Sequence, residues 1–136
     1  MPTPAPERPP TSTATSTTRA VLVVEDDPSV RDVVEMVLER AGYAVTSAAD
    51  GPAALQQAAD ATTFDLVVLD LMLPGLDGFE VCRRLRRTSA VPVLVLTARA
   101  DTADLVTALE VGADDYVTKP FEPLDLVERV NALLSR

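Results

Sequence analysis

The sequence has no histidine and a single cysteine, and these absences exclude several kinds of site. Without histidine the chain cannot build a histidine-ligated zinc site or a Ser-His-Asp triad, and it cannot carry a phosphohistidine. Because Cys82 has no second cysteine to pair with, no intrachain disulfide can form, which suits a reducing cytosolic compartment. Cys82 itself is expected to be a small apolar side chain of the core.

Long apolar runs and an excess of positive charge are also missing. No stretch approaches the ~20 apolar residues of a membrane span, and the N-terminus lacks the pattern of a secretory signal. We therefore expect a cytoplasmic protein with no membrane partner. The net charge of −9 argues against direct nucleic-acid binding by these residues, because that affinity comes from neutralising phosphates with Lys and Arg.

The chain divides into two parts of different character. Residues 1–18 are almost entirely Pro, Thr, Ser and Ala without apolar periodicity, which predicts a disordered tail. From residue 19 to residue 136, apolar runs alternate with amphipathic segments. A chain of this length has room for one folded domain, which we assign to residues 19–136.

The alternating segments predict five strands and five helices. Strands that read as continuous Val and Leu are buried on both faces, which is typical of a parallel sheet covered by helices. With five such units, a doubly wound open sheet is favoured over a barrel, which needs eight. The fold class is thus α/β. The expected strands are 21–24, 43–47, 64–69, 91–96 and 115–117, and the expected helices are 29–41, 51–60, 78–87, 102–111 and 123–134.

Polar side chains follow four of these strands. Glu25 and Asp26 come after the first strand, Asp70 after the third, Thr97 after the fourth and Lys119 after the fifth. Ligands of open α/β sheets bind at the carboxyl ends of the strands. If the four strands are neighbours, these side chains converge on one small pocket.

The chemistry of that pocket points to phosphoryl transfer. Carboxylates crowded together require a cation, and Mg²⁺ prefers an open shell of oxygen ligands. Asp26 and Asp70 can bind the ion directly, and Glu25 can reach it through water. Asp70 can then attack a phosphoryl group, while Lys119 and Thr97 hold two of its oxygens.

Four motifs occur in order along the chain: V-L-V-V-E-D-D-P at 21–28, V-V-L-D-L-M-L-P-G-L-D-G at 67–78, V-L-T-A-R at 95–99 and G-A-D-D-Y-V-T-K-P-F at 112–121. Together they resemble the receiver domain of bacterial two-component response regulators. The resemblance covers residues 19–136. It implies a flavodoxin-like sheet with strand order 2-1-3-4-5, a sensor histidine kinase as partner and Mg²⁺ as cofactor.

The resemblance also implies a role for individual residues. Such a domain is a signalling module that catalyses only its own phosphorylation and slow dephosphorylation. The Lys119–Pro120 bond is expected to be cis. The implied roles are the phosphoacceptor Asp70, the Mg²⁺-binding acids Glu25 and Asp26, a backbone carbonyl ligand from Met72, the phosphate-binding Lys119, and the switch residues Thr97 and Tyr116.

The C-terminal third looks most like the subfamily whose receivers dimerise and precede a winged-helix DNA-binding domain. That output domain is not present in these residues, so control of transcription is an expectation for a longer chain. The dimer face would lie on the last two helices and the strand between them. Three residues are the expected apolar centre of the face, namely Leu105, Leu109 and Val111.

Of the three charge pairs usual across that dimer, only Asp115 with Arg129 is kept. Thr107 leaves Asp125 without a basic partner, and Asn131 lies opposite Glu110. We therefore expect a weaker or apolar-driven dimer.

Alternative functions make different demands on particular residues. The chain could be a stand-alone receiver that acts by protein–protein contact or in a phosphorelay. A haloacid-dehalogenase-type phosphatase would require a second Asp two positions after Asp70, where this chain has Met72. A nucleotide-binding protein would have a glycine-rich phosphate loop after the first strand, and neither common form is present. Because methionine cannot orient a water molecule, Met72 also predicts slow loss of the phosphoryl group.

Overall fold

A computed structural model describes residues 18–59, 64–99 and 101–136. Its centre is a sheet of five parallel strands in the order β3-β2-β4-β5-β6. This order confirms the predicted 2-1-3-4-5 arrangement. The strands are β2 (Ala20–Val24), β3 (Ala44–Ala48), β4 (Leu66–Leu69), β5 (Val93–Thr97) and β6 (Asp115–Thr118).

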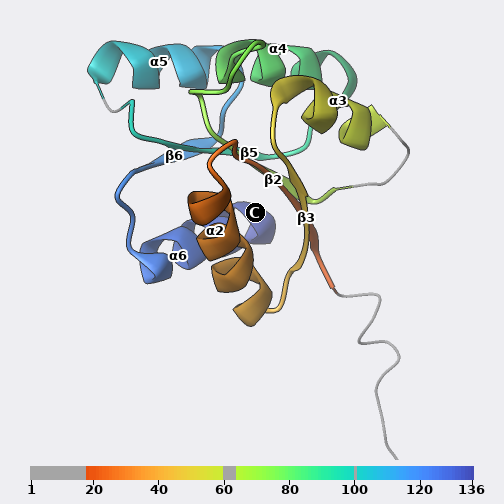
Figure 1. The fold of residues 1–136 in the computed structure, drawn as a ribbon, viewed down its shortest axis with the longest axis vertical. Coiled ribbons are helices and arrows are strands. Elements are labelled where there is room, and N and C mark those ends of the chain that lie inside the picture. The colour runs from red at the N-terminus through yellow and green to blue at the C-terminus, as the bar shows by residue number, and fades with distance from the viewer. Residues whose placement is uncertain (1–17, 60–63, 100) are drawn as a thin grey trace, which may run out of the picture.

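Five helices cover the two faces of the sheet (Figure 1). Helices α2 and α6 pack on one face, and α3, α4 and α5 pack on the other. This is the predicted doubly wound α/β fold. The helices are α2 (Pro28–Arg40), α3 (Gly51–Ala59), α4 (Gly78–Thr88), α5 (Thr102–Glu110) and α6 (Pro123–Ser135).

The apolar runs supply a separate core on each face. Successive side chains of a strand point to opposite faces, so a run of Val and Leu can fill both. In β2, Leu22 and Val24 pack toward α3, α4 and α5, while Val21 and Val23 pack toward α2 and α6. All four are buried. Because helices cover both faces of the sheet, a ligand can reach it at the ends of the strands.

Local sequence signals place α2 as predicted. The Asp27 side chain caps the helix by accepting hydrogen bonds from the N–H groups of Ser29 and Val30, and Pro28 occupies the first turn. The helix ends at Arg40, and Gly42 follows with φ +100°, a conformation that favours glycine.

Several strand bounds differ from expectation by one or two residues. The third strand begins at Leu66 rather than at 64, because the Asp65 side chain accepts a hydrogen bond from the Ala20 N–H at 2.7 Å. The fourth strand begins at Val93 and includes Thr97. The predicted tail, apart from residue 18, lies outside the described residues, as does residue 60 of the second predicted helix. None of the described helices is long and apolar enough to span a bilayer.

Candidate functional site

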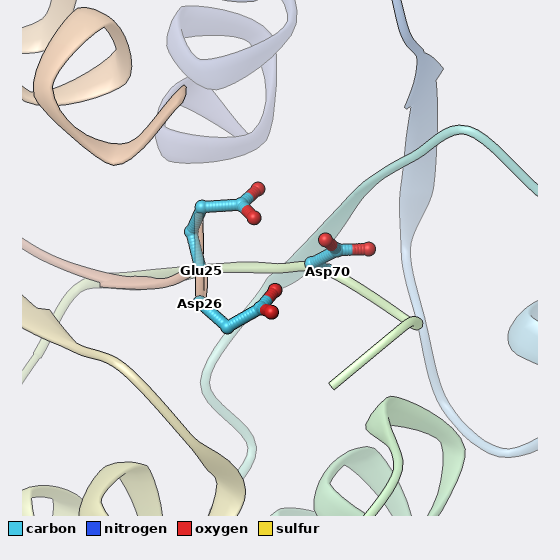
Figure 2. Close-up of side chains that lie close together, drawn as sticks. All are labelled: Glu25, Asp26 and Asp70. Atoms are coloured by element: carbon cyan, nitrogen blue, oxygen red, sulfur yellow. The ribbon is translucent and has the colours of Figure 1, made fainter. Parts of the chain in front are cut away.

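Three acidic side chains lie together at the carboxyl ends of β2 and β4. Carboxylate oxygens of Glu25, Asp26 and Asp70 all lie within 4.8 Å of one another. Figure 2 shows them reaching from adjacent strand ends into the same space. We call these three residues the acidic cluster. The predicted convergence of the first and third strand ends is thus found in the structure.

Sheet pairing brings the cluster together. Val24 of β2 lies opposite Leu69 of β4, so the residues that follow them are neighbours. The Asp70 N–H donates to the Val24 carbonyl at 3.0 Å, which continues the ladder to the phosphoacceptor candidate. Glu25 is anchored on its other side by a hydrogen bond from its N–H to the Ala48 carbonyl of β3. The two acids are therefore fixed by backbone bonds rather than by a flexible loop.

Lys119, the only lysine in the sequence, reaches the cluster from the end of β6. Its Nζ donates to Glu25 Oε1 at 2.7 Å and to Asp70 Oδ2 at 3.0 Å. Its backbone N–H donates to the carbonyl of Thr97 at 2.9 Å. The peptide bond between Lys119 and Pro120 is cis, as predicted.

Burial and the hydrogen bonds of Lys119 shift the pKa values of this site in opposite directions. Burial raises the pKa of the Glu25 carboxyl, and the charge of Asp70 acts in the same direction, while the hydrogen bond from Lys119 opposes both. Burial by itself lowers the pKa of Lys119, but its hydrogen bonds to Glu25 and Asp70 outweigh burial and leave the pKa raised. Lys119 is therefore a cation at neutral pH, and one cation does not balance three acids.

The donor set of the acidic cluster fits a hard divalent cation. All three side chains offer carboxylate oxygens, which Mg²⁺ prefers over nitrogen or sulfur. Asp26 is exposed while Glu25 and Asp70 are buried, so one side of the cluster opens to water. Such an open site leaves positions for water and for a phosphate oxygen. The acidic cluster therefore has the open arrangement of oxygen ligands that suits Mg²⁺, and not the closed arrangement of a structural metal site.

Met72 lies beside Asp70 at the rim of the cluster. Its backbone N–H donates to Asp70 Oδ1 at 2.9 Å, which orients that carboxylate. The residue is 54 % exposed. The methionine therefore presents an apolar group where water reaches the site.

The two predicted switch residues differ in their surroundings. Thr97 is fully buried, and its Oγ1 accepts a hydrogen bond from the Arg99 N–H at 3.0 Å. Within the described residues this hydroxyl donates to no protein acceptor, so its hydrogen remains available for a ligand oxygen. Tyr116 is half-buried and packs against the core on the α3, α4 and α5 side.

The residues of the predicted dimer face differ in how exposed they are. Leu109 is exposed, whereas Leu105 and Val111 are half-buried and Val111 packs against the core. Arg129 bonds both Asp115 oxygens at 3.0 Å within one chain. It also bonds Asp125 at 3.2 Å, so Asp125 has a partner on its own helix.

Sequence reasoning missed two supports of the site. Arg31 of α2 donates to the backbone carbonyl of Glu25 at 2.9 Å and fixes the loop after β2. Gly78 starts α4 so close to the site that a Cβ there would lie 2.4 Å from the Asp70 carbonyl oxygen. The glycine at the end of the 67–78 motif was a signal for this close approach.

Comparison with known proteins assigns the family. The sequence model of the response regulator receiver domain matches residues 21–131, which is most of the chain. The chain belongs to the response regulator receiver family. The predicted recognition is confirmed, and the protein is therefore a signalling domain.

Curated relatives of this receiver domain are transcriptional regulators. It is 53 % identical over 116 residues to the transcriptional regulatory protein CseB of Streptomyces avermitilis, covering 85 % of this chain and 49 % of CseB. It is 51 % identical over 116 residues to the DNA-binding response regulator MtrA of Mycolicibacterium smegmatis, covering 85 % of this chain and 50 % of MtrA. The chain thus spans about half the length of these relatives.

The solved structures agree on the fold. The receiver domain of the Francisella response regulator 1452 superposes with a TM-score of 0.80 at 34 % identity, covering 88 % of this chain and 98 % of that one. The predicted flavodoxin-like fold is confirmed at the level of the whole sheet.

Proposed function

We propose that this receiver domain is a phosphorylation-controlled switch and that Asp70 accepts the phosphoryl group. The observation that carries the proposal is the position of Asp70 between Lys119 and the other acids of the cluster. Asp70 is buried but lies beside the exposed Asp26, so that a donor can reach it from one side.

The residues act by positioning and by balancing charge. One Asp70 oxygen forms a bond to phosphorus as the bond from phosphorus to the donor breaks. Lys119 neutralises charge on the transferred group, and the Thr97 hydroxyl donates to another of its oxygens. The acidic cluster and the Met72 carbonyl would hold Mg²⁺, which when bound would supply the further positive charge that the transfer needs.

The donor in this proposal is the phosphohistidine of a sensor histidine kinase in the cytoplasm. Family membership supports this partner, because receiver domains interact with histidine kinases. These residues contain no histidine, so a donor phosphohistidine lies outside them.

The phosphoryl group adds about −1.5 to −2 charges, which Thr97 and Tyr116 convert into a change at the surface of α5, β6 and α6. This surface would then act as a homodimer face centred on Leu109. Transcription would be controlled through a DNA-binding domain outside this chain. The relatives support that output, since MtrA is described as DNA-binding and is about twice as long as the matched segment.

Intact mass after incubation with acetyl phosphate and Mg²⁺ tests the central step. The wild type should gain one phosphoryl group, and Asp70→Asn and Asp26→Ala should gain none. Asp32→Asn, which changes an exposed acid on α2 outside the cluster, is the matched control and should behave as wild type. A gain that persists in Asp70→Asn, or an unmodified wild type, would refute the proposal.

A further inference from the structure

A cluster of side chains outside the acidic site surrounds Arg99, two residues after Thr97. The Arg99 guanidinium bonds Asp104 of α5 through two nitrogens, at 3.1 Å from Nε to Oδ2 and 2.8 Å from Nη2 to Oδ1. The same guanidinium lies over the ring of Phe79 on α4, 5.2 Å from its centroid. A bidentate ion pair and a cation–π contact fix the side chain from two helices.

The backbone of Arg99 connects this cluster to the site. Its N–H donates to Thr97 Oγ1 at 3.0 Å, which occupies an oxygen lone pair and not the hydroxyl hydrogen. The orientation of that N–H depends on where the Arg99 residue is held. The side-chain contacts on α4 and α5 are thus linked to the Thr97 hydroxyl through the Arg99 backbone.

Both helix starts are themselves anchored. The N–H of Gly78, which precedes Phe79, donates to the Leu71 carbonyl at 3.1 Å, directly after Asp70. On α5, the Asp104 N–H donates to the side chain of Asp101, the N-cap of the helix. The contacts around Arg99 thus join the loop after β4 to the residues that follow β5.

We propose that Phe79 and Asp104 are positioning residues that act through Arg99 to preorganise Thr97 for the phosphoryl group. This inference rests on the proposed function of Asp70 and adds two residues outside the acidic cluster. A preorganised donor lowers the ordering cost of binding, so loosening Arg99 weakens capture of the phosphoryl group. The acidic cluster follows β2 and β4 rather than β5, so we expect its affinity for Mg²⁺ to be unchanged.

Asp104→Asn is the informative variant because electrostatics and positioning predict opposite changes in the affinity for an anion. Removing a negative charge near the site would by electrostatics alone strengthen binding of an anion. Loss of positioning weakens it. The probe is beryllofluoride, an anionic phosphoryl mimic, titrated calorimetrically into protein saturated with Mg²⁺, and Mg²⁺ alone is titrated separately.

We expect Asp104→Asn to bind beryllofluoride about three- to tenfold more weakly than wild type, with unchanged Mg²⁺ affinity. Phe79→Leu should cause a smaller loss, and Arg99→Lys, which keeps one ion-pair contact, should lie between wild type and Asp104→Asn. In an Arg99→Gln background, Asp104→Asn should add no further loss, because both changes act through the same side chain.

Glu80→Gln is the matched control. Glu80 is also a first-turn acid bonded to arginine, at 2.6 Å to Arg83 and 2.9 Å to Arg84, but these contacts stay on the outer face of α4. It should bind beryllofluoride as wild type does. Unchanged or tighter beryllofluoride binding by Asp104→Asn, or an equal loss of Mg²⁺ affinity, would overturn the positioning role. A wild type that does not bind beryllofluoride would instead refute the proposed function on which the role depends.

Discussion

Met72 occupies the position from which a polar side chain could direct water at a phosphoryl group on Asp70. Its N–H already holds Asp70 Oδ1, so the position of the residue is fixed while its exposed thioether can orient no water. Replacement by asparagine keeps the backbone bond and adds a hydrogen-bonding group. Met72→Asn should therefore shorten the phosphoryl lifetime, roughly tenfold, because an oriented water attacks more often.

The decay of the phosphorylated protein after removal of acetyl phosphate measures this lifetime. Met72→Leu is the control, since it keeps size and apolar character, and it should decay as slowly as wild type. If Met72→Asn and Met72→Leu decay alike, the side chain at this position does not govern water attack.

Cys82 illustrates how burial determines the reactivity of a residue. It is fully buried on α4, and burial raises the pKa of its thiol, with the nearby Arg86 only partly opposing the shift. Because the thiolate is the reactive form, a raised pKa leaves little of it at neutral pH. We expect no labelling of the folded protein by an aromatic disulfide reagent and full labelling of the single thiol in urea.

An exposed cysteine at the end of the same helix gives the control. Thr88→Cys should add one thiol that reacts rapidly in the folded protein, because residue 88 is exposed. Rapid labelling of wild-type Cys82 would mean that α4 opens far more readily than its packing suggests.

At the scale of elements, the start of α4 depends on one glycine. A Cβ at Gly78 would meet backbone atoms of Asp70 and Leu71 at 2.4 and 2.5 Å, and backbone cannot yield as a flexible side chain does. Gly78→Ala should destabilise the fold by roughly 3 kcal/mol, the upper range for overpacking, and should also displace Asp70. Thermal unfolding and phosphoryl uptake together measure both effects.

Gly42→Ala separates crowding from backbone strain. At Gly42 a Cβ would have no atom within 4 Å, so the cost is only that of its φ of +100°, about 1 kcal/mol. Gly42→Ala should keep full phosphoryl uptake. Equal destabilisation by the two alanines would contradict the role of close packing between α4 and the loop after β4.

The elements themselves follow mostly from local chemistry. Continuous Val and Leu runs, the Asp27 cap and the glycine after α2 act within a few residues, so the sequence alone located every helix and strand to within one or two residues. The strand bounds were less accurate, because they depend on pairing. Asp65 reads as part of a strand in sequence but bonds the start of β2, which only the assembled sheet reveals.

Part of the site could likewise be predicted from local sequence, and part depends on contacts between distant segments. Strand-end positions and the family motifs identified the acidic cluster and Lys119. The structure joins Lys119 to Glu25 and Asp70 by hydrogen bonds and places Asp26 beside them. The contacts of Arg99 were not foreseen. They depend on the side-chain conformations of residues from three segments, and an arginine after a strand carries no signal of which aromatic ring or acid it will reach.

For the whole molecule, the decisive question is whether phosphorylation produces a dimer. Val106 and Leu109 are 47 and 45 % exposed on α5, whereas Arg129 is already engaged by Asp115 and Asp125 of its own chain. Arginine so engaged is less available to a second copy, so association relies on apolar contact. With beryllofluoride and Mg²⁺, sedimentation should show a concentration-dependent mixture of monomer and dimer.

Leu109→Asp should leave only monomer in that experiment, because it introduces a charge at the centre of the face. Met36→Asp, which changes a similarly exposed apolar residue on α2, should leave the mixture unchanged. A monomer at every concentration in beryllofluoride would exclude the dimer and favour output through a different partner.

Lys119 allows the site to be observed spectroscopically without any mutation. Because no other lysine occurs in the sequence, protein grown on isotopically labelled lysine carries a single labelled side-chain ammonium, located between Glu25 and Asp70. Its magnetic resonance signal would report directly when a cation or a phosphoryl group enters, in a spectrum free of overlap. The composition of this chain thus provides a spectroscopic probe at the atom where the change occurs.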